Sequence, residues 1–316
     1  MKTSTPRIRE RGASISVLIP TYRRAEPLRN CVASILAGSR VPDEILMVGR
    51  EGDLESEHIF TILRQESQSR VLLRTAWTTK PGHVPPVEVG VGAASGELIA
   101  IVDDDVTVTS DWLASLVPHF HDPKVGVVGG RVLVVDAPPV KPRGKPGCMS
   151  WYGKLWGNLG SLDRTVAVDS VMEGNCIWRR ELLASLEFDP VLNFDDASMY
   201  GLDLCLQAKK RGFTIKYDPL ALVYHYPAPR ADGLDRQERG PRVFSYCRNY
   251  TYIMLKRLPF WRRLVFLAWW FLIGERDAWG LGSLAIDELS GNGRKNRHIS
   301  QALRGKVEGA RLSFRG

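Results

Sequence analysis

Three consecutive aspartates, residues 103–105, directly follow a short apolar run, residues 98–102, and this junction constrains the fold more than any other feature of the chain. The run is continuous and not alternating, which is typical of a strand buried on both faces of a parallel sheet. Since side chains alternate along an extended strand, we expect Asp103 and Asp105 to point one way and Asp104 the other. Two carboxylates at the carboxyl edge of an α/β sheet predict a site for Mg²⁺ or Mn²⁺ that leaves positions open for phosphate oxygens. The alternative is a solvated acidic turn that caps the following helix.

Short apolar runs alternate with helical patterns along the first two thirds of the chain. The predicted strands comprise residues 15–20, 44–48, 71–73 and 98–102, and the predicted helices comprise residues 28–36, a segment ending near 65, and 87–95. This alternation favours a layered α/β sheet with parallel strands. Right-handed crossovers would place the carboxyl ends of the first, second and fourth strands at one edge. A β-rich run at 125–135, a helix at 202–211 and strands at 215–217 and 220–224 follow.

Positive charge is concentrated in the last part of the chain. Residues 230–316 contain 17 Lys or Arg and 8 Asp or Glu, whereas the remaining residues contain 26 and 27. We therefore predict a nearly neutral domain at residues 14–230 and a basic, amphipathic helical region at residues 231–316 that has an anionic partner. The five cysteines form no CxxC pair and no zinc spacing, and the first residues contain no apolar signal segment, so we expect a cytoplasmic protein.

A block of aliphatic and aromatic residues follows two arginines, Arg262 and Arg263. The block, residues 264–273, is far shorter than the ~20 residues that span a bilayer. The arginines at its head and the paired Trp269 and Trp270 predict a helix that lies on a membrane surface. The alternative is an ordinary helix that docks on the core. Because the charge flanks the apolar block and does not interleave with it, we expect no nucleic-acid partner and predict peripheral association with the inner face of the cell membrane.

Several segments resemble, in their order and spacing, the family 2 glycosyltransferases, which are inverting enzymes with the GT-A fold. The matching segments are residues 17–24 (VLIPTYRR), 96–105 (GELIAIVDDD), 173–180 (EGNCIWRR), 203–208 (DLCLQA), 212–213 (GF), 218–219 (DP) and 223–225 (VYH). The resemblance extends over residues 14–230. It implies a Rossmann-like GT-A sandwich that binds a nucleotide-diphospho-sugar of the UDP, GDP or dTDP type across the strand ends.

The resemblance also implies a set of nucleotide-sugar-binding residues. They are Pro20, Thr21, Arg23, Arg24, Asp103 and Asp104. Arginine suits a diphosphate because its guanidinium offers forked donors and a fixed charge. A solvated turn is the alternative for the two arginines.

A divalent cation, Mg²⁺ or Mn²⁺, is a further implication of the resemblance. The candidate ligands are Asp105, Asp103 and His225, of which Asp103 would hold the ribose or a metal-bound water. Such a cation stabilises the negative charge that develops on the departing nucleotide diphosphate. A histidine after an apolar strand also suits a purely structural role, so both roles stay open for His225.

Two other segments are the candidates for acceptor binding and proton transfer. Glu173, Gly174 and Asn175 are expected to bind sugar or acceptor hydroxyls, or else to form a helix-entry turn. An inverting transfer also needs a general base that takes the proton of the acceptor hydroxyl. The candidates are Asp203, Asp195 and Asp196, of which Asp203 is favoured by its position in the family pattern and Asp196 by its freer loop; Asp203 could instead cap its helix.

The sequence departs from the family pattern in two places. The family often carries Glu-Asp two or three residues before the position of Asp203, where this chain has Tyr200 and Gly201. It also commonly carries an acidic pair after the second strand, for which Glu51 or Asp53 would have to substitute. The nucleobase is therefore not predicted.

These patterns together predict a metal-dependent inverting glycosyltransferase that acts on a polysaccharide, glycolipid or lipid-linked glycan acceptor. The main alternative is a relative that binds sugar nucleotide or glycan without transfer, which the Tyr-Gly pair favours. A nucleotidyltransferase is disfavoured because no glycine-rich, lysine-bearing loop follows the first strand. The absence of GxGxxG after a strand and of GxxxxGK[ST] likewise disfavours a dinucleotide-binding oxidoreductase and a P-loop ATPase.

Overall fold

The computed structural model describes residues 12–66, 71–138, 141, 144–194, 199–227, 239–275, 278–282 and 298–314. The strands are β1 Ile15–Pro20, β2 Glu44–Arg50, β3 Leu72–Thr78, β4 Leu98–Val102, β5 Val106–Val108, β6 Val125–Val134, β7 Val166–Val168, β8 Asn175–Arg179, β9 Thr214–His225, β10 Gly274–Glu275 and β11 Ala278–Trp279. The helices are α1 Ala25–Leu36, α2 Leu54–Glu66, α3 Val84–Ala93, α4 Trp112–Leu116, α5 Arg180–Ala184, α6 Tyr200–Lys210, α7 Arg239–Arg257, α8 Phe260–Leu272 and α10 Ile299–Ser313, with short 3₁₀ turns η1 Val117–His121, η2 Leu159–Ser161 and η3 Pro190–Leu192.

Within the described residues, nine strands form one central sheet in the order β3-β2-β1-β4-β8-β6-β9-β5, with β7 paired to β9. The first four strands of this order are parallel, as the sequence predicts. The sheet as a whole is mixed, because β8 runs antiparallel to both β4 and β6. Because β6 and β9 pair in parallel and run the same way as β1 to β4, the expectation of a parallel sheet is correct for six of the nine strands and wrong for β5, β7 and β8. Since β8 starts where β4 ends, with Asn175 opposite Val102, the residues before β8 lie beside the aspartates after β4.

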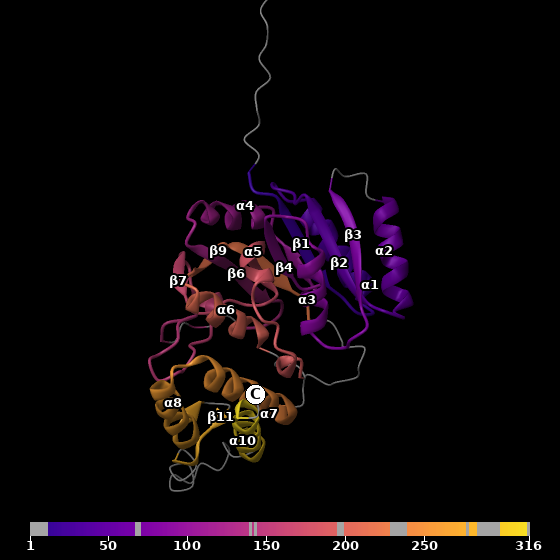
Figure 1. Cartoon of the computed structure of the whole chain (residues 1–316). Coiled ribbons are helices and arrows are strands. Elements are labelled where there is room, and N and C mark those ends of the chain that lie inside the picture. The colour runs from indigo at the N-terminus through magenta and orange to yellow at the C-terminus, as the bar shows by residue number, and fades with distance from the viewer. Residues whose placement is uncertain are drawn as a thin grey trace, which may run out of the picture.

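Helices cover both faces of the sheet (Figure 1). Successive side chains of β1 alternate between two buried clusters, so that Val17 and Ile19 face one side and Leu18 faces the other. The first cluster includes residues of α1, α2 and α4, and the second includes residues of α3, α5 and α6. Burial on both faces explains why the strands read as continuous apolar runs. Cys31 and Cys205 are buried, one in each of these two clusters.

The carboxyl-terminal helices α7, α8 and α10 lie together at one end of the molecule, on the side of α6 (Figure 1). Their centre is aromatic: Trp270 stacks on Phe266 and contacts Tyr250. The Lys306 ammonium, fully buried, donates to the carbonyl oxygens of Trp270, Ala278 and Trp279 at 2.5, 2.8 and 3.0 Å. Three backbone acceptors for one buried cation supply the pairing that a buried charge requires.

The structure corrects one expectation about α8. Trp270 is not on the surface but fully buried, and its indole N–H donates to the Thr251 hydroxyl at 2.8 Å. The exposed apolar residues of α8 are Phe260, Trp261, Leu264 and Leu272. No helix among the described residues is both long and apolar enough to cross a bilayer.

Candidate active site

The triple aspartate forms a turn between β4 and β5, because β4 already ends at Val102. Strand alternation therefore does not apply, and the expectation that Asp103 and Asp105 share a direction is wrong. Asp104 and Asp105 both contact Arg24, whereas the Asp103 carboxylate lies against the backbone of Gly174. A β-carbon added to Gly174 would come within 2.0 Å of Asp103 Oδ2, so the glycine is needed for this close approach.

Asp104 is buried and ties the end of β1 to the end of β4. It accepts hydrogen bonds from the Thr21 hydroxyl at 2.7 Å and from Arg24 Nη1 at 2.9 Å. The same Arg24 nitrogen lies 3.2 Å from Asp105 Oδ2. Burial raises the pKa of Asp104, while Arg24 and the Thr21 hydroxyl oppose the shift. Thr21, Arg24 and the acids, predicted separately from the sequence, therefore form one charged cluster.

Asp105 and His225 lie next to each other because β5 pairs with β9, with Val106 opposite His225. His225 Nε2 is 3.1 Å from Asp105 Oδ1. An imidazole nitrogen and a carboxylate oxygen at this separation can share one divalent cation. Among the described residues no group of three His, Cys, Asp or Glu side chains is arranged to hold a metal. One or two carboxylates completed by phosphate oxygens and water are the usual protein ligands of Mg²⁺ at a nucleotide, and Asp105 fits this pattern. The His225 imidazole is a ligand that Mn²⁺ accepts more readily than Mg²⁺ does, so the donor set as a whole fits Mn²⁺ better.

Asp103 is exposed to solvent at this edge of the sheet. Loss of solvation by the surrounding protein, first, and repulsion from the Asp105 and Asp104 carboxylates raise the pKa of Asp103. Nearby His225 and Arg24 act in the opposite direction and lower it. Three acids beside one permanent cation, Arg24, leave a surplus of negative charge. Such an edge favours a cation or a hydrogen-bond donor as its ligand.

The turn after β1 holds the second predicted arginine. Pro20 ends β1, and Arg23 adopts a positive φ of 52°, which is uncommon for a residue with a side chain. The Arg23 N–H donates to Asp53 Oδ2 at 2.8 Å, which stabilises this conformation. Asp53 also accepts hydrogen bonds from the backbone and the hydroxyl of Ser56. Its carboxylate is therefore committed to the turn and to the start of α2, away from the nucleobase role considered for it.

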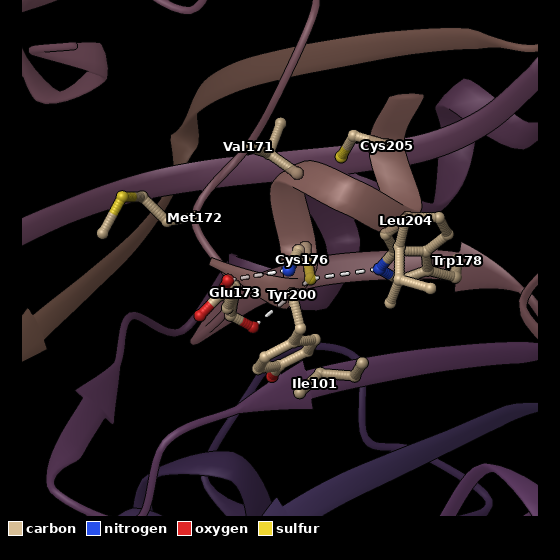
Figure 2. Close-up of a pocket in the computed structure, with 10 residues that line it drawn as sticks. Ile101, Val171, Met172, Glu173, Cys176, Trp178, Tyr200, Leu204 and Cys205 are labelled. Carbon is tan, nitrogen blue, oxygen red and sulfur yellow. Dashed lines mark hydrogen bonds between the residues drawn. The ribbon is translucent and has the colours of Figure 1, made fainter. Parts of the chain in front are cut away.

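Glu173 lies directly before the strand that pairs with β4. Its Oε1 accepts a hydrogen bond of 2.7 Å from the Gly201 N–H in the first turn of α6. The side chain lines a small hollow with Ile101, Cys176 and Tyr200, which Figure 2 shows. Burial, first, and the nearby Asp103 charge raise the pKa of Glu173 to about 7, against the opposing effect of the Gly201 hydrogen bond.

Asn175 is expected from the sequence to bind sugar or acceptor hydroxyls, but its side chain has a structural role instead. It is fully buried, and its amide nitrogen donates to the carbonyl oxygens of Arg131 and Ala221 at 2.9 and 3.0 Å. Its amide oxygen accepts from the Trp112 indole at 2.8 Å. Asn175 is the first residue of β8, and its side chain points into the protein. Its hydrogen bonds connect β8 to β6, β9 and α4.

Asp203, a candidate general base from the sequence, also has a structural role instead. It is 1% exposed, and Arg257 holds it in a two-point ion pair, with Nε–Oδ1 and Nη2–Oδ2 distances of 2.6 and 2.7 Å. Gln207 donates a third hydrogen bond, at 2.8 Å. A carboxylate engaged in this way is neither an accessible base nor a helix cap; it joins α6 to α7. Asp195 and Asp196, the other candidate bases, lie outside the described residues.

Comparison with known proteins identifies the family. The profile of the family described as "Glycosyltransferase like family 2" matches residues 12–240. The chain belongs to this family. Its α/β sheet is of the GT-A, Rossmann-like type, with carboxyl-terminal helices added.

Individual relatives of this family 2 chain are distant. It is 26% identical over 243 residues to the uncharacterized protein y4gI of Sinorhizobium fredii, a match that covers 72% of this chain and 26% of the relative. It is 27% identical over 219 residues to the pre-mycofactocin glycosyltransferase of Mycobacterium tuberculosis, covering 67% of this chain and 42% of the relative. The chain thus spans less than half the length of these two curated relatives.

One solved structure has a similar fold over nearly the whole chain. This is the mannosyltransferase PcManGT of Pyrobaculum calidifontis in complex with GDP-Man and Mn²⁺. The TM-score is 0.59 at 14% identity, and the match covers 96% of this chain and 88% of the mannosyltransferase. The likeness concerns the fold.

Two residues of this family 2 chain, Arg257 and Gly201, shape the site although neither is predicted as a site residue from the sequence. Arg257 follows in α7, 54 positions after Asp203, and no local pattern marks it as a partner. Gly201 makes room for another residue: a β-carbon there would lie 2.3 Å from Glu173 Cγ. The replacement of the usual acids by Tyr200 and Gly201 was the available signal.

Proposed function

We propose that this chain is a metal-dependent inverting glycosyltransferase that transfers sugar from a nucleotide-diphospho-sugar to a polysaccharide, glycolipid or lipid-linked glycan. The observation that carries the proposal is the charged cluster at the carboxyl edge of β1 and β4, in which Asp105 and His225 lie 3.1 Å apart. Ligands of open α/β sheets bind at this edge. The proposed catalytic domain comprises residues 14–230.

Each residue of the charged cluster is assigned a different contact with the nucleotide-sugar donor. Thr21 and Arg24 lie where the nucleotide diphosphate crosses the strand ends, and Arg24 can exchange its contacts with the acids for contacts with phosphate. Asp103 is exposed and accepts hydrogen bonds from the ribose or from a bound water. A divalent cation held by Asp105 and His225 would neutralise the charge of the leaving diphosphate.

Donor binding tests the proposal without knowledge of the acceptor. Purified protein is titrated calorimetrically with UDP, GDP and dTDP, each in the presence of Mn²⁺ and again in the presence of EDTA. We expect saturable binding of at least one nucleotide that requires Mn²⁺, and release of that nucleotide from the matching sugar donor. Absence of binding and of release over the UDP, GDP and dTDP donors would contradict the proposal.

A second candidate is a relative that binds the sugar nucleotide without transfer. Its support is the engaged Asp203 together with the Tyr-Gly pair at positions 200–201. This candidate predicts Mn²⁺-dependent binding with an intact donor after prolonged incubation. Release of nucleotide diphosphate at a rate above that of a protein-free control excludes it.

Association with a membrane surface belongs to the same proposal, with the protein at the cytoplasmic face and no nucleic-acid partner. Three neighbouring apolar side chains at the start of α8 are largely exposed: Phe260 by 73%, Trp261 by 59% and Leu264 by 54%. Exposed aromatic side chains on a basic region suit the interface of a bilayer with anionic lipids.

Vesicle flotation tests this part of the proposal. We expect the full chain to float with vesicles of phosphatidylglycerol and phosphatidylcholine and not with pure phosphatidylcholine. Trp261→Ser with Leu264→Ser should reduce the floated fraction several-fold. Equal flotation of the double variant, or retention on duplex DNA at the same salt concentration, would count against it.

A further inference from the structure

We propose that Glu173 is the carboxylate that removes the proton of the acceptor hydroxyl, a role that rests on the transferase function proposed above. In an inverting displacement a base must reach the nucleophile beside the donor sugar. The aspartates considered for this role do not supply it among the described residues: Asp203 is buried in its ion pair with Arg257, and Asp195 and Asp196 lie outside them.

The sheet register places Glu173 beside the donor site. Asn175 pairs with Val102, so the two residues before β8 run alongside the aspartate turn that follows β4. Gly174 lies against the Asp103 carboxylate, which puts Glu173 one residue away from an acid of the charged cluster. Glu173 thus lies in the turn that leads directly into β8, a strand in the middle of the sheet.

Gly201 gives the Glu173 side chain its space. The β-carbon of any other residue at 201 would lie 2.3 Å from Glu173 Cγ and 3.1 Å from Oε1. A side chain of the usual acid at this position and the present conformation of Glu173 therefore exclude each other. With glycine at position 201, α6 contributes no carboxylate at this position, and the space is taken by the carboxylate of Glu173 from the turn before β8.

One oxygen of Glu173 remains available for a substrate. Oε1 accepts the Gly201 N–H, which fixes the orientation of the carboxylate. Among the described residues, Oε2 receives no hydrogen bond, and the side chain is only half-buried. The hollow that it lines is otherwise mostly apolar, with Ile101 and Val171 in its wall (Figure 2). A carboxylate fixed by one oxygen and open at the other is suited to accept a proton.

The electrostatic surroundings agree with this geometry. The titratable groups close to Glu173 are Asp103 after β4, Cys176 in β8, and Tyr200 and Cys205 in α6. Burial raises the pKa of the two thiols and the phenol, so these three groups stay uncharged near neutral pH. Asp103 is the one that bears negative charge, and with burial it raises the affinity of Glu173 for a proton.

The chemical step balances without another reactant. The acceptor hydroxyl gives its proton to Glu173 Oε2 as its oxygen forms a bond to the anomeric carbon of the donor. The bond between this carbon and the diphosphate oxygen breaks, and its electron pair leaves with the nucleotide diphosphate. Glu173 then returns the proton to solvent when product departs.

Two substitutions separate proton transfer from helix capping. Glu173→Gln keeps an oxygen that can accept the Gly201 N–H but removes the base, and Glu173→Ala removes both. The control is Glu181→Gln, which removes an exposed carboxylate from α5. The assay follows release of nucleotide diphosphate from UDP-N-acetylglucosamine and from GDP-mannose with Mn²⁺, so that water replaces the unidentified acceptor.

The expected result is a fall in kcat of about 10²- to 10⁴-fold for Glu173→Gln, the usual contribution of a general base, while KM and the Mn²⁺-dependent affinity for the nucleotide stay unchanged. Formate at high concentration should restore part of the kcat of Glu173→Ala and not alter Glu181→Gln. A kcat of Glu173→Gln equal to that of the wild type, or loss in Glu173→Ala that formate leaves unchanged, overturns the assignment while the transferase function stands. A wild-type protein that neither binds nor cleaves a donor overturns both.

Discussion

The ion pair between Asp203 and Arg257 offers the sharpest test of how the carboxyl-terminal helices are joined to the catalytic unit. Both Asp203 oxygens are paired to the guanidinium, and the side-chain exposures are 1% for the acid and 16% for the arginine. Arg257→Met would leave Asp203 buried with Gln207 as its remaining partner. Removing one partner of a buried pair costs about 3–5 kcal/mol, and because water reaches part of the arginine we expect about 3 kcal/mol.

The partner substitution should be milder. In Asp203→Asn the amide keeps the Gln207 contact, and Arg257 keeps its 3.3 Å contact with the exposed Glu187, which contributes little. We expect a loss of about 1.5–2 kcal/mol there, at the lower end of the ~1.5–3 kcal/mol that a hydrogen bond to a charged group contributes. In the double variant no charge stays buried without a partner, so the two losses should not add, and the coupling energy should be about 2 kcal/mol.

Urea unfolding of the four proteins, followed by tryptophan fluorescence and by far-ultraviolet circular dichroism, measures these free energies. Coincident curves from both probes establish that the two units unfold together. The same four proteins also test the role of Asp203 in catalysis. If Asp203 only joins α6 to α7, the folded double variant should release nucleotide diphosphate at a rate near that of the wild type. Loss of less than about 1 kcal/mol in Arg257→Met, or additive losses, would refute the structural reasoning.

Three further outcomes are expected. Asp105→Asn should abolish Mn²⁺-dependent binding of the nucleotide diphosphate while leaving the thermal midpoint in EDTA within a few degrees of the wild type; unchanged affinity by calorimetry would contradict the metal assignment. The folded-state pKa of Glu173, about 7, exceeds its ordinary value of 4.5, so the folded protein binds this proton more tightly than the unfolded chain does. The free energy of unfolding should therefore fall as pH rises from 4.5 to 7, by at most about 3 kcal/mol. Urea titrations at several pH values should show that Glu173→Gln lacks this pH-dependent component. Lys306→Met should leave three carbonyl oxygens without their donor and destabilise the helical region by about 3 kcal/mol; a midpoint in urea equal to that of the wild type would show that these bonds contribute nothing.

Much of the architecture follows from the sequence because strand and helix periods are local properties. The runs at β1, β2 and β4 are apolar since both faces of the sheet are covered, and each is long enough to be recognised as a strand. The aspartates after β4 and the Thr-Tyr-Arg-Arg turn after β1 could be placed at one edge because parallel strands end on the same side. The order of these motifs was sufficient to suggest the family.

Other features depend on contacts between residues that are far apart in the chain. The antiparallel insertion of β8 between β4 and β6 cannot be read from its own five residues, yet it brings Glu173 to the acid turn and turns Asn175 inward. Whether Trp270 faces lipid or core depends on how α8 docks against α7. A side chain's hydrophobicity or charge is set by its type, but its partners are set by packing.

The sequence by itself determined the strand edges, the acids that follow them and the basic, aromatic character of the carboxyl-terminal region. Only the tertiary structure decided which carboxylates are free. Asp203 and Asp53 both bind partners that no spacing rule connects to them, whereas Glu173, in the turn before β8, keeps one open oxygen because Gly201 of α6 leaves room for its side chain. The reason is physical: a carboxylate acts as a base only if its lone pairs are unoccupied, and their occupancy is a property of the folded neighbourhood.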